Sequence, residues 1–347
     1  MPAPTSDSSR GRTAGEDLHG QTVAVLGLGS IGLRHARNSL ALGAAVVGVD
    51  PDPERRRLAE ESGARVVEDR AAALDGAAAA IVATPSIDHL DGLAACLGRV
   101  SRVMVEKPLT HDPDAAGPLL EQAKAAGTAV YCGFNLRFHE TVVEARRLLD
   151  AGALGQILWA TFVGSSDLRD WRPGRDIRAG YTNHPDAGGV LFDYSHEIDL
   201  AHHLLGPSEL AFARTAQSGT LGLQVEDIAV LGLIHPNNAL STVQLDYCSK
   251  PAIREAKIRG TEATREFDLL SRRLHVYGPD GRTRHRAEGD GSFDLDYQAE
   301  LRAFLCPDSA TAETLAEADA GLSVSRLVVA ARRSPLLVQQ PGRASPS

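Results

Sequence analysis

The chain has 347 residues, a length that typically forms about two domains. Its 36 basic and 45 acidic residues give a net charge of −9, which argues against a nucleic-acid partner. Apolar residues make up 43%, as in globular domains, and no apolar run approaches the roughly 18 residues that cross a membrane. The first twenty residues carry Asp7, Glu16 and Asp17 and no apolar segment, so we expect a cytoplasmic protein without a membrane partner.

Residues 20–136 alternate short apolar runs with stretches typical of helices. The apolar runs are TVAVLG (22–27), AVVGVD (45–50), AAIVAT (79–84), RVMVE (102–106) and AVYCGF (129–134). Short Val-rich runs that are each followed by a helix predict parallel strands buried on both faces. We therefore expect an α/β Rossmann domain, a doubly wound parallel sheet, over residues 20–136. Residues 1–19 are rich in Ser, Pro, Gly and Thr, which predicts a disordered tail.

Residues 137–332 show a different order of elements. Helices are predicted over 139–155, 186–206, 293–305 and 312–334, and strands over 156–166, 209–218, 228–236, 239–249, 256–270 and 273–278. Strands in succession with few crossovers predict an α+β domain with a mainly antiparallel open sheet. We expect this domain to bind the substrate and to self-associate through its open sheet face, and residues 333–347 to form a second tail.

The cysteines and histidines do not predict a metal site. The four cysteines, Cys96, Cys132, Cys248 and Cys306, are far apart and form no CxxC pair, as is usual for thiols in a reducing compartment. The histidines are similarly dispersed, so no metal ligand set is predicted.

A glycine-rich loop follows the first predicted strand. Its six residues are Gly27, Leu28, Gly29, Ser30, Ile31 and Gly32, a GxGxxG that opens a helix. In this context the motif indicates a dinucleotide pyrophosphate held at the helix N-terminus. The second strand ends at Asp50, whose carboxylate can bind a ribose 2′-hydroxyl and favours NAD. Arg55 and Arg56 follow closely, so NADP stays an alternative.

Several further motifs together resemble the Gfo/Idh/MocA family of oxidoreductases, over roughly residues 20–332. They are Thr84-Pro85 with His89, then Glu106-Lys107-Pro108, then GFNLRF (133–138), and GGVLFDYSHEID (188–199). The resemblance implies Lys107, Asp193 and His196 as the catalytic residues. It adds Thr84, Pro85, His89, Glu106 and Lys107 to the expected NAD-binding residues. The family usually places Asp and His four positions apart, whereas here they are three apart, a spacing that still puts both on one helix face.

Hydride transfer between a carbinol carbon and nicotinamide requires a base near the hydroxyl and a cation near the developing alkoxide. Lys107 and His196 can each fill either role, and the sequence leaves the proton acceptor open. Asn135 and Arg137 are candidates for substrate binding, with a structural hinge as the alternative for both. Trp171 and Arg172 lie in a long polar segment and are candidates for lining the nicotinamide.

These features predict an NAD(H)-dependent dehydrogenase or ketoreductase for a sugar, aminosugar, cyclitol or sugar nucleotide. Two alternatives stay open. One is an enzyme that cleaves a glycosidic bond through transient oxidation by NAD, without net redox change. The other is a dinucleotide-sensing regulator, which needs neither Lys107 nor His196.

Overall fold

The structure is a computed structural model, and it describes residues 18–289, 291–307 and 309–338. Most of the two predicted tails, 1–19 and 333–347, lies outside the described residues. Two short parts do not behave as tails. Leu18 is buried against the first domain, and Leu336–Val338 forms a strand, β16, that pairs in parallel with β8 (Glu209–Gln217).

The first sheet is the predicted doubly wound sheet, with an added edge. Its strand order is β15-β6-β5-β4-β1-β2-β3, in which β3-β2-β1-β4-β5-β6 are parallel. These strands are β1 (Thr22–Leu26), β2 (Ala45–Val49), β3 (Arg65–Val66), β4 (Ala79–Val82), β5 (Arg102–Glu106) and β6 (Ala129–Gly133). The helices between them are α1 (Ser30–Ala41), α2 (Pro53–Glu61), α3 (Arg70–Leu74), α4 (His89–Cys96) and α5 (Pro113–Ala125). The strand order reverses between β1 and β4, which is where such sheets bind dinucleotides.

The chain returns to this sheet near its C-terminus. Strand β15 (Ala316–Glu317) pairs antiparallel with β6, and α10 (Phe293–Leu305) packs on α1. Leu301 and Phe304 of α10 belong to the same buried cluster as Val25 of β1. The two halves of the chain are therefore joined by shared apolar packing as well as by the chain itself.

The second sheet is large and mainly antiparallel. Its order is β14-β13-β12-β11-β7-β10-β9-β8-β16, in which β7–β10 and β8–β16 are parallel pairs and the other described pairs are antiparallel. The strands are β7 (Ile157–Ser165), β8 (Glu209–Gln217), β9 (Ile228–Ile234), β10 (Leu240–Asp246), β11 (Ile253–Gly260), β12 (Thr264–Asp268), β13 (Arg273–Tyr277) and β14 (Thr283–Glu288). The stretch 256–270, predicted as one strand, is the hairpin of β11 and β12.

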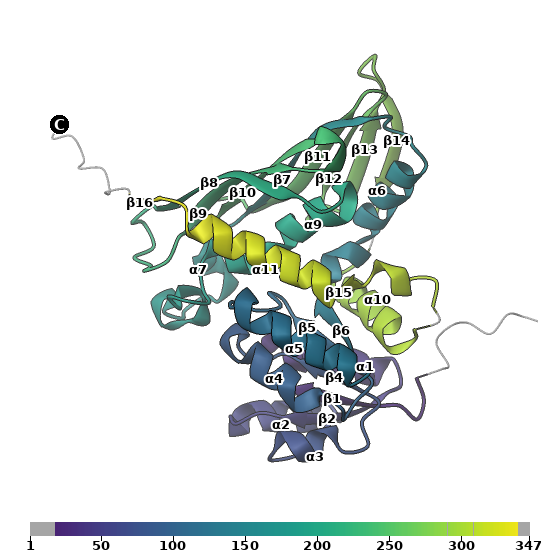
Figure 1. Cartoon of the computed structure of the whole chain (residues 1–347), viewed down its shortest axis with the longest axis vertical. Helices are drawn as coiled ribbons and strands as arrows, with labels where there is room; N and C mark the ends of the chain where they lie inside the picture. Colours follow the sequence, from purple (N-terminus) through teal and green to yellow (C-terminus); the bar gives the residue numbers. More distant parts are fainter. Residues whose placement is uncertain (1–17, 290, 308, 339–347) are drawn as a thin grey trace, which may run out of the picture.

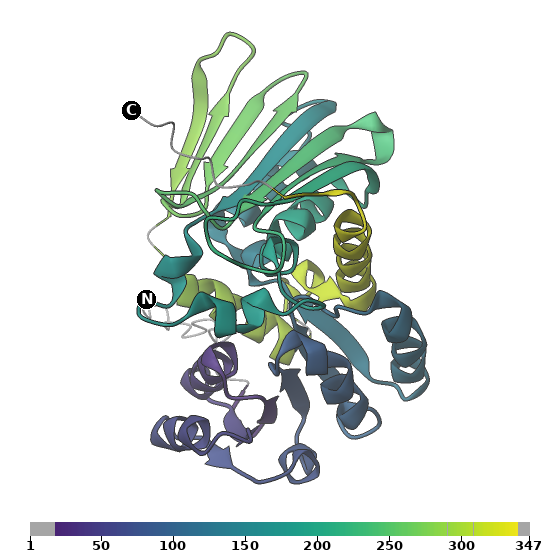
Figure 2. The ribbon, with the colours of Figure 1, turned by 90° about the vertical axis from the view of Figure 1, so that its left-hand side faces the viewer.

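Helices lie on one face of this second sheet (Figure 1). They are α6 (Glu140–Asp150), α9 (Ser195–Leu205) and α11 (Ala318–Arg332), and each contacts the strands beneath it. The short helices α7 (Leu168–Trp171) and α8 (Val190–Asp193) lie at the level where the two sheets approach each other (Figures 1 and 2). Within the described ranges, no helix combines the length and the apolar character needed to cross a bilayer.

Candidate active site

The glycine loop after β1 is shaped by close backbone contacts. Gly27 has a φ of +91°, and a Cβ there would lie 2.7 Å from the carbonyl oxygen of Ala83 after β4. A Cβ on Gly32 would lie 1.9 Å from the carbonyl oxygen of Gly27. A Cβ on Gly29 would meet no atom within 4 Å, because Gly29 faces a cavity. Two of the glycines therefore permit tight packing, while the third leaves backbone open to a ligand.

This cavity fits an anionic dinucleotide. Gly29 is the N-cap of α1 and provides no side-chain hydrogen bond, so the first N–H groups of that helix keep their capacity to bind an anion. By contrast, Asp52 caps α2 and Asp112 caps α5 through their carboxylates. After the neighbouring strand β4, Thr84 Oγ1 is buried without a partner among the described residues, and Thr84 lines the same cavity. A phosphate or amide of a ligand would satisfy these groups.

Asp50 closes one end of the cavity, after β2. Its Oδ2 accepts a hydrogen bond of 2.7 Å from the Leu28 N–H, and its Oδ1 accepts one of 2.8 Å from the Asp52 N–H. These bonds hold the carboxylate beside the glycine loop, where a ribose would lie. Arg56 donates to the Asp50 carbonyl oxygen at 3.3 Å, while Arg55 and Arg70 line the cavity.

The first cavity has a volume of about 510 Å³ and brings most of the predicted residues together. The predicted residues that line it are Gly27, Gly29, Ser30, Ile31, Asp50, Thr84, Pro85, His89, Glu106, Lys107, Arg172 and Asp193. Gly32 does not line it but packs behind the loop. Trp171 and His196 line an adjoining cavity of about 1020 Å³, which we call the second cavity. Lys107 and Asp193 line both, so they lie where the two cavities meet.

Hydrogen bonds of His89 and Glu106 hold the backbone around this junction. The buried ring of His89 lies between the carbonyl oxygens of Pro108 and Thr84, at 2.8 and 3.0 Å, and so connects the loops after β4 and β5. His35 Nε2 donates to Glu106 Oε1 at 2.6 Å, and Glu106 Oε2 accepts from the Lys107 N–H at 3.1 Å. Burial raises the pKa of Glu106, but the hydrogen bond from His35 and the charges of His35 and Lys107 outweigh it and hold the pKa below its usual value.

Lys107 and Asp193 are in direct contact. The Lys107 Nζ donates a hydrogen bond of 2.7 Å to the backbone carbonyl oxygen of Asp193, not to its carboxylate. The Asp193 carboxylate accepts a bond of 2.5 Å from the Tyr247 hydroxyl. Burial raises the pKa of Asp193, and the Lys107 charge and the Tyr247 hydrogen bond oppose that rise. Tyr247 was not predicted, because it follows β10 in no recognisable motif.

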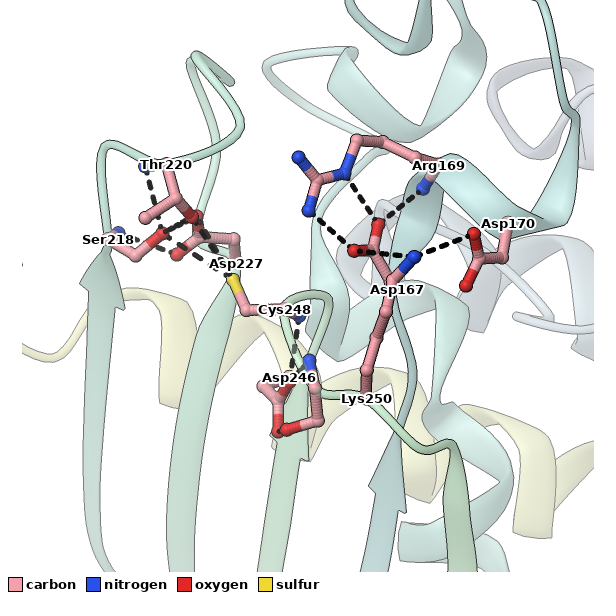
Figure 3. A network of polar contacts seen from close by, with 10 residues as sticks. Asp167, Arg169, Asp170, Ser218, Thr220, Asp227, Asp246, Cys248 and Lys250 are labelled. Atoms are coloured by element: carbon pink, nitrogen blue, oxygen red, sulfur yellow. Dashed lines mark hydrogen bonds and ion pairs between the residues drawn. The ribbon is translucent and has the colours of Figure 1, made fainter.

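Hydrogen bonds at the end of β10 hold Tyr247 in place. Its N–H donates to the Asp227 carbonyl oxygen and its own carbonyl accepts from the Leu168 N–H, both at 2.9 Å. The neighbouring Asp246 accepts from the N–H groups of Cys248 and Ser249, each at 2.7 Å. Figure 3 shows Asp246 beside Cys248. These bonds fix the strand end and therefore the direction of the Tyr247 side chain.

His196 is separated from Asp193 by a break in the helix. Asp193 ends α8, Tyr194 has φ −96° and ψ 28°, and His196 lies in the first turn of α9. Their spacing predicted one shared helix face, and the break in the helix shows that this prediction was wrong. Both residues nevertheless line the second cavity. Burial, followed by the charges of Lys107 and Arg254, lowers the pKa of His196 well below its ordinary value, so the imidazole is neutral near pH 7.

The segment after β7 forms one wall of the second cavity. Trp171 Nε1 donates to Ser166 Oγ at 2.6 Å, and its ring meets those of Tyr194 and Tyr247 edge to face, each at 5.7 Å between centroids. The Arg172 guanidinium lies 5.2 Å above the centre of the Tyr181 ring. Trp171 thus packs against two residues that surround Asp193.

Asn135 and Arg137 lie elsewhere. Both are buried and neither lines either cavity. Arg137 donates from Nη2 and Nε to the Asp199 carboxylate at 2.6 and 2.9 Å, and from Nη1 to the Leu315 carbonyl oxygen at 3.4 Å. This placement favours the hinge alternative over the substrate-binding role that we listed for both residues.

The fold and the glycine loop define a protein with an NAD-binding Rossmann domain, and family comparison agrees. Residues 21–134 match the family model "Oxidoreductase family, NAD-binding Rossmann fold", and residues 142–266 match the model "GFO/IDH/MocA C-terminal domain". The chain belongs to the GFO/IDH/MocA family. This confirms the expected family, the fold class and NAD as the cofactor of the first domain.

Individual relatives are named as cyclitol dehydrogenases. The chain is 32% identical over 197 residues to the NAD(+)-dependent scyllo-inositol 2-dehydrogenase of Bacillus subtilis, covering 54% of this chain and 55% of that protein. It is 30% identical over 234 residues to inositol 2-dehydrogenase 2 of Saccharopolyspora erythraea, covering 64% and 66%. The chain thus matches between about half and two thirds of these relatives' length. The structure of an inositol dehydrogenase homologue of Azotobacter vinelandii with NAD+ has a TM-score of 0.78, at 20% identity, covering 90% of this chain and 95% of that one.

Proposed function

We propose that this protein is an NAD(H)-dependent dehydrogenase or ketoreductase that acts on one carbinol of a sugar, aminosugar, cyclitol or sugar nucleotide. The observation that carries the proposal is the junction of the two cavities. There Lys107 and Asp193 lie between the glycine-loop cavity and the cavity that contains His196. A dinucleotide in the first cavity and a polyol in the second would meet at these side chains. The names of the relatives support this substrate class.

The residues proposed to hold the dinucleotide are those of the first cavity. The open first turn of α1 would take the pyrophosphate, and Asp50 the adenosine ribose. Thr84 Oγ1 offers a hydrogen bond beside the junction. When bound, NAD supplies the acceptor for a hydride, and NADH supplies the donor.

We propose that His196 accepts the proton of the reacting hydroxyl. A neutral imidazole has a free lone pair, and the low pKa of His196 keeps it neutral near pH 7. Its Nδ1 is buried without a partner among the described residues, which leaves Nε2 as the nitrogen toward the cavity. The Lys107 ammonium would donate to the same substrate oxygen and stabilise the charge that forms on it.

The proposed role of Asp193 is to set the geometry of Lys107 relative to His196. Its backbone carbonyl holds Lys107 Nζ, and its carboxylate is anchored by Tyr247. A fixed ammonium costs no reorganisation when the substrate oxygen becomes charged. In this proposal Asp193 supports the two groups that touch the substrate.

The test is a spectrophotometric assay of NADH formation and consumption with a panel of sugars, aminosugars, cyclitols and nucleotide sugars. We expect absorbance at 340 nm to change with at least one substrate, and NAD to be preferred to NADP. Release of an aglycone without net NADH change would instead identify the glycoside-cleaving alternative. Tight NADH binding with no turnover on the whole panel would favour a regulator.

We also propose a cytoplasmic homodimer or homotetramer. Cys96, Cys132 and Cys248 are free thiols, which supports a reducing compartment. In β8 and β10 the exposed apolar side chains Phe212 and Leu240 alternate with buried neighbours such as Ala213 and Ser241, so they lie on the face of the second sheet opposite its helices. A second copy of the chain covering this face would remove them from water. Light scattering coupled to gel filtration tests this, and a monomer at micromolar concentration would reject it.

A further inference from the structure

The second cavity has an unusual charge distribution. Three charged side chains line it and do not line the first cavity, namely Arg34, Arg175 and Arg254, and all three are arginines. The only carboxylates among its described lining residues are Glu106 and Asp193, which it shares with the first cavity. This basic lining occurs in a chain whose net charge is −9. A positively charged cleft attracts anionic ligands even when the protein as a whole is negatively charged.

The arginines differ in how far their charges are already balanced. Arg254 donates to the buried Glu197 carboxylate at 2.7 Å, and Arg34 to the exposed Asp294 at 3.1 Å. Arg175 has no ion pair or side-chain hydrogen bond with any described residue. Arg172, which lines both cavities, contacts the Tyr181 ring and forms no ion pair with a described carboxylate, although its charge lowers the pKa of Asp193. Arg172 and Arg175 are therefore the charges most available to a ligand.

These two side chains stand on an anchored segment. At its start, the buried Asp167 carboxylate accepts from Arg169 at 2.5 Å and lies 3.5 Å from Lys250 Nζ (Figure 3). The Arg175 N–H then donates to the Arg172 carbonyl oxygen at 3.2 Å, which closes a turn and keeps both residues on one short stretch. The turn holds the backbone of both residues, which lowers the entropy lost when both guanidinium groups bind one oxyanion.

The dinucleotide does not account for all of these charges. Its pyrophosphate would lie on the open first turn of α1, where Gly29, Ser30 and Ile31 line both cavities on the side that the glycine loop forms. Arg175 and Arg254 do not line the first cavity. Trp171, Tyr194 and Tyr297, which line only the second cavity, provide aromatic faces for a sugar ring or a base. The charges and the rings therefore suit the second substrate.

We propose that the second cavity binds an anionic carbohydrate, whose carboxylate or phosphate is held by Arg172 and Arg175. This rests on the proposed function and narrows its substrate class, because neutral sugars and cyclitols lack the group that the two arginines would bind. The oxyanion has two chemical sources, a sugar acid or a phosphorylated sugar. Both are recognised through the same bidentate contacts.

The test measures binding rather than turnover. Full-length protein saturated with NADH is titrated in a calorimeter with myo-inositol, D-glucuronate and UDP-glucose, and each titration is repeated in about 0.05 and 0.5 M NaCl. We expect glucuronate or UDP-glucose to bind at least about tenfold more tightly than myo-inositol. The higher salt concentration should weaken the binding of the anion but not that of myo-inositol. Which of the two anions binds more tightly distinguishes the sugar acid from the phosphorylated sugar.

The critical variant is Arg175→Gln, and the matched control is Arg178→Gln. Arg178 lies on the same segment but pairs with Asp176 at 2.9 Å and lines neither cavity. We expect Arg175→Gln to remove most of the tenfold preference, with NADH affinity unchanged, and Arg178→Gln to keep it.

The inference is overturned if myo-inositol binds as tightly as both anions, if neither glucuronate nor UDP-glucose binds, or if the anion preference survives Arg175→Gln. Failure of the proposed function looks different. In that case an anion binds and depends on Arg175, yet no substrate of the panel changes the NADH absorbance.

Discussion

The hydroxyl of Tyr247 donates a 2.5 Å hydrogen bond to the carboxylate of Asp193, a residue 54 positions away whose backbone carbonyl holds Lys107. This contact joins the end of β10 in the second domain to the junction of the two cavities. It opposes the rise in the Asp193 pKa that burial causes. Tyr247 is therefore placed to set both the position of Asp193 and its protonation.

Replacing Tyr247 by Phe should shift the acid limb of the pH profile. Loss of the hydrogen bond removes a contribution that lowers the Asp193 pKa, so this pKa rises further. If the ionised carboxylate is the active form, kcat/KM then begins to fall at a higher pH than in the unaltered protein. We expect a loss of about tenfold near pH 7 that shrinks at alkaline pH. Measuring kcat/KM from pH 5 to 10 checks this.

The control for this variant is Tyr277→Phe, which removes the hydroxyl of a tyrosine in β13 that contacts His275 and lines neither cavity. Its pH profile should match that of the unaltered protein. A Tyr247→Phe profile that is merely lower at every pH would mean that Tyr247 supports only the fold.

Removing the Lys107 side chain should separate catalysis from cofactor binding. Lys107→Ala deletes the ammonium that we place against the substrate oxygen, so kcat should fall by at least about 100-fold. NADH affinity, measured by fluorescence titration, should change little, because the proposed pyrophosphate site lies at α1. Lys124→Ala, which removes an exposed lysine paired with Glu121, is the control. Normal turnover in Lys107→Ala would reject the role that we assign.

Asp50 should determine the choice between the two dinucleotides. Asp50→Asn removes a negative charge beside the proposed ribose site while keeping the size of the side chain. The repulsion of a 2′-phosphate then falls, so the ratio of NADH to NADPH affinity should drop by about tenfold. Asp69→Asn, at the N-cap of α3 and outside the first cavity, is the matched control. An unchanged ratio contradicts the proposed contact with the ribose.

The regular part of the fold was predictable because each element has its own pattern. The apolar runs at 22–27 and 102–106 appear as β1 and β5, since a strand buried on both faces must be apolar throughout. Strands β15 and β16 were not predicted. They are short edge strands whose partners, β6 and β8, lie far away in the sequence, so no local pattern distinguishes them.

The site was predictable only where it depends on local motifs. The glycine loop and the residues around Lys107 each follow one strand end, and parallel strands bring such ends together. Tyr247 and Arg254 come from other strands and have no motif, so only the folded chain places them near Asp193 and His196. Arg137 shows the opposite case. It stands in a suggestive motif, but its partner Asp199 is 62 residues away and makes it part of the core.

The buried pair of Arg137 and Asp199 should matter for stability. Arg137→Met leaves the Asp199 carboxylate buried without its guanidinium, which should lower the free energy of unfolding by about 3–5 kcal/mol. Urea unfolding measures this change, and the KM of the folded variant should stay unchanged, since Arg137 lines neither cavity. Arg147→Met breaks an exposed pair with Glu144 and should cost much less. A raised KM without a loss of stability would restore the substrate-binding role.

Buried histidines should make the protein sensitive to mild acid. Burial lowers the pKa of His139 and of His202 to about 4, below the value of about 6.5 in the unfolded chain. Between these two values the unfolded state binds more protons than the folded state, so stability falls as the pH decreases through this window and is fully retained above it. Urea midpoints at pH 7.5, 6 and 5 should therefore decrease in that order.

His202→Gln, which keeps a hydrogen-bonding group near Ser208, should reduce this pH dependence of stability, whereas replacing the exposed His19 by Gln should not. A His202→Gln variant that loses stability in acid as steeply as the unaltered protein would show that other groups control the transition.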